Sequence, residues 1–177
     1  MNAGLLIKII GGSVVICSSF VLGYILSTNL SIRSCELRQL QNILEYFENE
    51  IKFLSSKLTE ALEKSSKMGN GAIAKIFTDT SYKLKECYGT TVEDEWERAV
   101  LLNRKKMQLA NEDIEILLSF GKILGKSDLE GQIKNIKNTI NRLKIQEQKA
   151  EERRKKDQIM YRNITILCGI AIVIILV

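Results

Sequence analysis

The chain has 177 residues, a net charge of +5, and neither histidine nor proline. Without histidine the usual imidazole base and the commonest metal ligand are missing, so an enzyme is the weakest functional class. The 26 basic and 21 acidic residues are nearly balanced, which argues against the clustered basic surface expected of a nucleic-acid-binding protein.

The chain begins with an apolar segment over residues 3–27, in which Lys8 is the only charged residue. As a helix, Ala3 to Leu26 would extend about 36 Å, enough to cross a hydrocarbon core of about 30 Å. A cleaved signal peptide is the alternative, but the apolar stretch is long for one and its single positive charge lies inside it. The sequence therefore predicts a retained transmembrane helix over residues 3–27.

Two helices are predicted next, from about Ser31 to Leu54 and from Ser56 to Lys67. Their apolar residues recur at steps of three and four, which is typical of an amphipathic helix. These residues are Leu37, Leu40, Leu44, Phe47, Ile51, Leu54 and Leu58. Met68–Gly71 is a predicted break, because glycine and asparagine tolerate the positive φ angles that end helices.

A third helix is predicted from Ala72 to about Glu86, followed by a turn over Tyr88–Thr91. Thr90 and Glu93 have the spacing of a capping box, which predicts that a fourth helix begins there. That helix carries Trp96 on its apolar side. A fifth helix is predicted from about Asn111 to Leu124.

The last predicted helix begins after a second capping-box spacing, Ser127 with Glu130. Beyond Leu129 only two glycines and no proline interrupt the pattern, so a single helix could extend to the end of the chain. Its charged stretch Gln146–Gln158 is interpreted as a solvated stalk.

Residues 159–177, about 28 Å of helix, form a second predicted transmembrane helix. The alternative, a buried helix of a soluble core, is disfavoured because the segment has no polar stripe.

Basic residues beside the two apolar segments predict the orientation in the membrane. Both clusters bound the middle of the chain, so residues 31–156 are expected in the cytoplasm and both termini outside. The second cluster would also attract anionic lipid, by about 1 kcal/mol per basic side chain. The residues concerned are Arg33, Arg38, Arg153, Arg154, Lys155 and Lys156.

The predicted fold is therefore all-α: a six-helix antiparallel bundle domain with a charged stalk over residues 31–156, flanked by transmembrane helices. No strand pattern is present, and Gly121–Gly125 lacks the spacing of a phosphate-binding loop. The acidic residues from Glu93 to Glu97 open a helix, where negative charge offsets the helix dipole, so a catalytic carboxylate pair is a poor interpretation. No cofactor, metal or small-molecule substrate is predicted.

Two segments, Gly89–Glu97 and Leu117–Asp128, resemble the stage III sporulation protein AB family of endospore-forming bacteria. The first is similar to that family's glycine-led turn into a tryptophan-bearing helix, and the second to its paired glycines followed by an aspartate. The matching positions are Trp96, Gly121, Gly125 and Asp128. The resemblance covers essentially the whole chain, including both apolar ends.

The resemblance implies a subunit of the transenvelope complex that links mother cell and forespore, in the mother-cell membrane facing the forespore. It also implies a helical domain similar to the cytoplasmic domain of type II secretion and type IV pilus platform proteins. The implied partners are the complex's cytoplasmic secretion-type ATPase and its other membrane subunits. No catalytic residues are implied.

Each matching position also has a purely structural interpretation. Trp96 is suited to the core, Gly121 to a close approach of two helices, Gly125 to a helix C-terminus, and Asp128 to the first turn of a helix, where its charge is favourable.

The preferred hypothesis is a platform subunit that couples a cytoplasmic motor ATPase to the membrane assembly. Two alternatives are a passive tethered scaffold and a regulator with a ligand between its helices.

Overall fold

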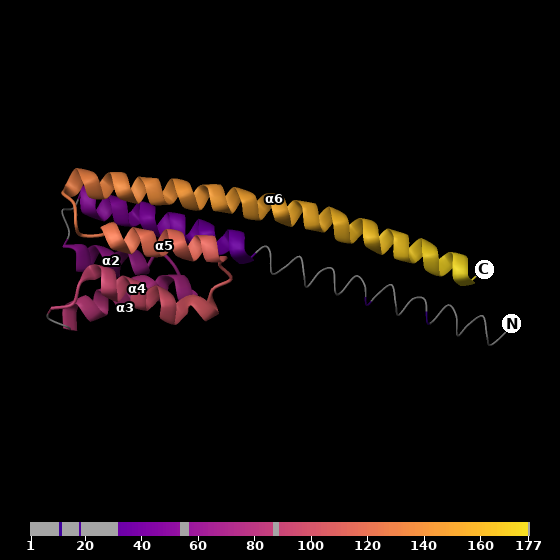
Figure 1. Cartoon of the computed structure of the whole chain (residues 1–177), viewed down its shortest axis with the longest axis horizontal. Helices are drawn as coiled ribbons and strands as arrows, with labels where there is room; N and C mark the ends of the chain where they lie inside the picture. The colour runs from indigo at the N-terminus through magenta and orange to yellow at the C-terminus, as the bar shows by residue number, and fades with distance from the viewer. Residues whose placement is uncertain (1–10, 12–17, 19–31, 54–56, 87–88, 177) are drawn as a thin grey trace. The chain divides into compact units, whose positions relative to one another are not determined.

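The computed structural model describes residues 11, 18, 32–53, 57–86 and 89–176, and every regular element within them is helical. Residues 32–53, here called the leading helix, precede five further α-helices (Figure 1). These are α2 (Leu58–Ser66), α3 (Gly71–Glu86), α4 (Val92–Asn103), α5 (Asn111–Ile123) and α6 (Leu129–Leu176), with a short 3₁₀-helix, η1 (Arg104–Lys106), after α4. The described chain thus has six α-helices and no strand, which confirms the all-α prediction.

The chain divides into two compact units. One, here called the bundle domain, is Ile32–Lys149, and the other comprises residues 1–31 and 150–177. Helix α6 is 48 residues long and contributes to both units. This agrees with the prediction of one uninterrupted helix from Leu129 almost to the end of the chain.

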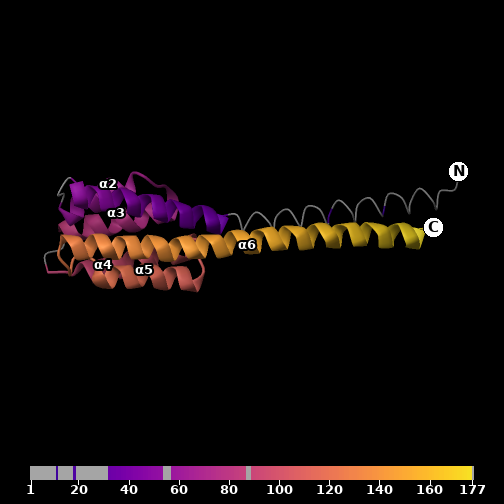
Figure 2. The same ribbon diagram turned by 90° about the horizontal axis from the view of Figure 1, so that it is seen from above.

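The core of the bundle domain is built from the stripes that the sequence predicted. Leu37, Leu40, Leu44 and Phe47 of the leading helix are fully buried. In chain order, α3 packs against α2 and α4, and α4 packs against α5. Both views place the leading helix alongside the first part of α6 (Figures 1 and 2). Burying these apolar stripes supplies the main favourable free energy of a helical bundle.

Two predicted helix caps are wrong by one residue. The cap of α4 is Thr91, whose hydroxyl accepts from the backbone N–H of Asp94 at 3.1 Å. At the start of α6, Asp128 Oδ1 accepts from the N–H of Gly131 at 3.1 Å. Thr90 with Glu93 and Thr91 with Asp94 have the same spacing, so a sequence pattern cannot choose between them. In the fold, Thr91 and Asp128 are the residues whose side-chain oxygens accept from the first turn of each helix.

The predicted membrane spans are not tested by the described residues. Residues 3–27 lie outside that part of the chain, apart from Gly11 and Ser18, whereas residues 159–176 are helical within α6. In the part of the chain that the structure describes, no helix has both the length and the apolar character needed to cross a bilayer. Both transmembrane helices remain predictions.

Candidate functional site

A row of aromatic side chains connects four helices of the bundle domain around Trp96. The indole ring is fully buried and meets Phe77 of α3 edge-on at 5.1 Å between ring centroids. It also meets Phe120 of α5 at 5.2 Å, and Phe120 meets Phe47 of the leading helix at 6.4 Å. T-shaped pairs contribute about 0.5–1.5 kcal/mol each beyond their buried area. Trp96 is therefore a centre of packing.

Gly121 provides the space that this tryptophan occupies. Trp96 Nε1 donates a hydrogen bond to the backbone carbonyl of Leu117 at 2.8 Å, which holds the indole ring against α5. A Cβ atom built on Gly121 would lie only 2.4 Å from Trp96 Cδ1. Only glycine lets the ring lie this close to the helix backbone.

Gly125 and Asp128 shape the connection between α5 and α6. Gly125 has a φ of +78°, the left-handed conformation that glycine adopts at low cost after a helix C-terminus. Asp128 caps α6, as described above. The structure thus brings Trp96 and Gly121 into contact and places the other two matching positions at helix ends.

Arg33 forms a two-pronged ion pair with Asp113 in the interior of the bundle domain. Arg33 Nε donates to Asp113 Oδ2 at 2.8 Å and Nη2 to Oδ1 at 3.0 Å. The Asp113 side chain is completely buried, and its Oδ2 also accepts from the backbone N–H of Ala110 at 2.8 Å, at the start of α5. The hydrogen bond to Asp113 raises the pKa of Arg33, because it stabilises the charged guanidinium. One carboxylate therefore caps α5 and anchors the leading helix.

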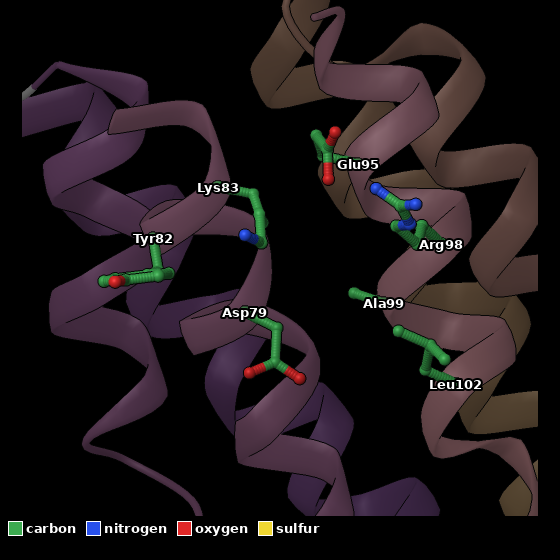
Figure 3. A pocket seen from close by; sticks show the side chains of 7 residues that line it. All are labelled: Asp79, Tyr82, Lys83, Glu95, Arg98, Ala99 and Leu102. Carbon is green, nitrogen blue, oxygen red and sulfur yellow. The ribbon is translucent and has the colours of Figure 1, made fainter. Parts of the chain in front are cut away.

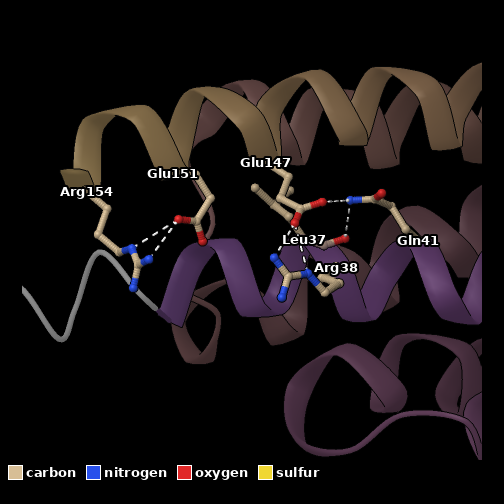
Figure 4. Close-up of polar contacts among 6 residues, drawn as sticks. All are labelled: Leu37, Arg38, Gln41, Glu147, Glu151 and Arg154. Atoms are coloured by element: carbon tan, nitrogen blue, oxygen red, sulfur yellow. Dashed lines mark hydrogen bonds and ion pairs between the residues drawn. The ribbon is translucent and has the colours of Figure 1, made fainter. Parts of the chain in front are cut away.

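A second charged cluster connects the leading helix to α6 (Figure 4). Arg38 donates through Nε and Nη2 to Glu147 Oε1 at 2.9 and 2.7 Å, and Gln41 Nε2 donates to Glu147 Oε2 at 2.8 Å. Burial opposes ionisation of Glu147, but the hydrogen bonds from Gln41 and Arg38 and nearby positive charge outweigh it. The pKa of Glu147 is lowered as a result.

Asp113 and Glu147 are two polar residues whose roles no sequence pattern indicates. The sequence predicts only an orientation signal at Arg33 and Arg38, yet both have carboxylate partners within the bundle domain. The partners lie 80 and 109 residues further along the chain. No local spacing pattern could have identified pairs at such separations.

The four basic residues 153–156, predicted to flank the second membrane segment, lie in one stretch of α6. Arg154 is held by Glu151 one turn earlier, with Nε and Nη2 at 3.1 and 3.0 Å from Oε2 (Figure 4). Arg153, Lys155 and Lys156 are exposed. Their charges are available to an anionic surface or partner. Within the described residues, no group of acidic or cysteine side chains is arranged to hold a metal ion.

Comparisons with known proteins agree with one another. A family model described as stage III sporulation protein AB matches residues 8–177. The curated Stage III sporulation protein AB of Bacillus subtilis (strain 168) is 23% identical over 171 residues, which cover 97% of this chain and 99% of the relative. A solved structure titled Stage III sporulation protein AB is similar, with a TM-score of 0.64 and 26% identity. The matched region covers 70% of this chain and 96% of the solved chain.

Proposed function

Because the chain belongs to the stage III sporulation protein AB family, we propose that it is a platform subunit of the complex linking mother cell and forespore. It couples a cytoplasmic secretion-type ATPase to the other membrane subunits of that complex. A role in sporulation follows from the family itself. Near-complete coverage of the curated relative supports a shared role for the whole chain.

The proposal places the chain in the mother-cell membrane facing the forespore, with the bundle domain in the cytoplasm. Two apolar segments, residues 3–27 and 159–177, serve as anchors, and both termini lie outside. The exposed basic side chains at 153, 155 and 156 support this orientation, because basic residues beside a membrane segment are retained on the cytoplasmic side.

One observation supports coupling over passive tethering. Helix α6 is a single helix of 48 residues that begins in the bundle domain and contributes to both compact units. A continuous helix can transmit a displacement or a rotation, whereas a flexible linker absorbs it. In the proposed mechanism, movement of the ATPase on the bundle domain reaches the membrane subunits through α6.

The test is a flexible Gly-Ser insertion after Gln158, compared with a helix-forming insertion of equal length rich in Ala, Glu and Lys. If α6 transmits movement, the flexible insertion abolishes sporulation while the helical insertion retains part of it. Normal sporulation with the flexible insertion would instead support the alternative, a passive scaffold that only recruits or spaces partners.

Both variants need a control for membrane orientation, and Cys35 provides it because it is exposed. With the other three cysteines changed to serine, an impermeant thiol reagent should label Cys35 only after the cells are opened. Labelling from outside intact cells would contradict the proposed orientation, since a cytoplasmic ATPase could not then reach the domain.

A further inference from the structure

The surface between α3 and α4 contains a groove of about 450 Å³. Asp79, Tyr82 and Lys83 line it from α3, and Glu95, Arg98, Ala99 and Leu102 line it from α4 (Figure 3). The small side chain of Ala99 leaves the hollow between the two helices. Around it are exposed apolar side chains, with Tyr82 55% and Leu102 70% exposed.

Glu95 is an unusual residue in this groove. It is only 5% exposed, and its Oε2 atom is buried without a hydrogen-bond partner among the described residues. Figure 3 shows its carboxylate at the gap between the two helices. A buried carboxylate oxygen without a partner costs folding free energy. A cation placed in the groove beside this carboxylate would offset the cost through its charge.

The groove itself is lined by two acidic and two basic side chains, and the acidic excess comes from a neighbouring hollow. Asp79 already accepts from Asn103 at 3.2 Å, and Lys83 pairs with Glu86 on its own helix at 3.6 Å. A neighbouring hollow shares Arg98 and Leu102 with the groove and adds two further carboxylates, Asp94 and Glu97. Acidic side chains therefore outnumber basic ones around the two hollows.

We propose that this groove is a docking site for a lysine or arginine side chain carried on an amphipathic helix of another protein. The charged group pairs with Glu95, its aliphatic stem lies over Ala99, and apolar neighbours on the partner helix cover Tyr82 and Leu102. Basic side chains combine an apolar stem with a charged tip in this way, and a groove between two helices is a common site for a third. The proposal does not depend on membrane anchoring or on coupling to an ATPase.

The test uses the full chain with the photo-crosslinker benzoylphenylalanine in place of the exposed Leu102. The probe is a synthetic amphipathic helical peptide with one arginine at the centre of its apolar face. The control peptide has citrulline there, which keeps the shape and loses the charge. We expect the arginine peptide to give at least a roughly tenfold higher crosslinking yield, because leaving one member of a buried charge pair unpaired weakens binding strongly.

Two matched variants assign the effect to Glu95. Glu95→Gln should reduce the yield of the arginine peptide to that of the citrulline peptide, whereas Glu115→Gln, which removes an exposed carboxylate on α5, should leave it unchanged. Glu95→Gln should also raise the melting temperature, since an unpaired buried charge is lost. A lower melting temperature would show that Glu95 is structural and would overturn the proposal.

Other outcomes would also overturn it. Equal yields for the two peptides would show that charge is not recognised. An adduct between two copies of the chain, or with lipid, would show that a different occupant covers the groove. If Glu95→Gln does not fold, Asp79→Asn is the replacement test, because it removes charge while keeping an acceptor for Asn103. It should lower the arginine yield severalfold, and no change would count against the proposal.

Discussion

At the scale of single residues, Trp96 and Gly121 depend on each other. The indole ring packs edge-on against Phe77 and Phe120 and donates a hydrogen bond to the backbone of α5. It cannot move away from α5 without losing these contacts. A tryptophan on an apolar helix face and a glycine on another were both visible in the sequence, but only the fold shows that they are partners.

Gly121→Ala should destabilise the bundle domain by about 1–3 kcal/mol, the usual cost of inserting a methyl group into a packed core. Alanine favours a helix over glycine by up to about 1 kcal/mol, which offsets only part of this cost. Urea unfolding of the full chain, followed by circular dichroism, measures the change. Lys122→Ala, at the exposed neighbouring position, is the control and should change little. Equal stability of the two variants would contradict the contact.

At the scale of the helices, the loop between α5 and α6 shows how a start signal is selected. Ser127, Asp128 and Glu130 each have a side chain that can serve at a helix N-terminus. In the fold, Asp128 Oδ1 accepts from the N–H of Gly131, whereas Ser127 Oγ is buried without a hydrogen-bond partner among the described residues. Asp128 is therefore the residue that caps α6, and Gly125, with its φ of +78°, turns the chain between α5 and this cap.

Asp128→Ala should therefore lower the free energy of unfolding by about 1 kcal/mol, the typical value of an N-cap. Ser127→Ala should leave it unchanged or raise it slightly, because an unpaired buried hydroxyl is removed. The two single variants can be compared by thermal unfolding under identical conditions. A larger loss of unfolding free energy for Ser127→Ala than for Asp128→Ala would indicate that Ser127 caps α6, as the sequence pattern predicts.

At the scale of the whole molecule, the leading helix is held to α5 and α6 by two charged clusters. Arg33 pairs with Asp113, and Arg38 with Glu147. The first pair is buried, so removing one partner would leave an uncompensated charge, whereas Arg38 is 61% exposed and its pair is worth less. The leading helix therefore joins the bundle domain through long-range contacts.

The lowered pKa of Glu147 predicts a pH dependence of stability. A carboxylate whose pKa is lower in the folded than in the unfolded state stabilises the fold above its unfolded pKa of about 4.5. That contribution is lost as the pH falls through the folded pKa. Glu147→Gln should cost about 1 kcal/mol or less at pH 7, and the difference from the unaltered chain should shrink below about pH 4.5. Urea unfolding at pH 7 and pH 3.5 measures this, and a constant difference would contradict it.

Much of the fold could be predicted because helical periodicity is a local property. Leu37, Leu40 and Phe47 are buried as their spacing indicates, and α6 begins at the predicted residue and continues almost to the end of the chain. Helical periodicity predicts burial less well at the ends of helices. Leu129 belongs to the apolar stripe of α6 but is 50% exposed, because it lies in the first turn of the helix.

The sequence by itself determined the helical class, the number and approximate bounds of the helices and the family, since these depend on spacing along the chain and on short motifs. The tertiary structure alone decided which side chains meet: Trp96 with Gly121, Arg33 with Asp113, and Arg38 with Glu147. It also decided that Glu95, which reads in the sequence as one of several acids opening a helix, is buried at the groove between α3 and α4. Such contacts join residues far apart in the chain or depend on how neighbouring helices pack, and only the folded arrangement specifies them.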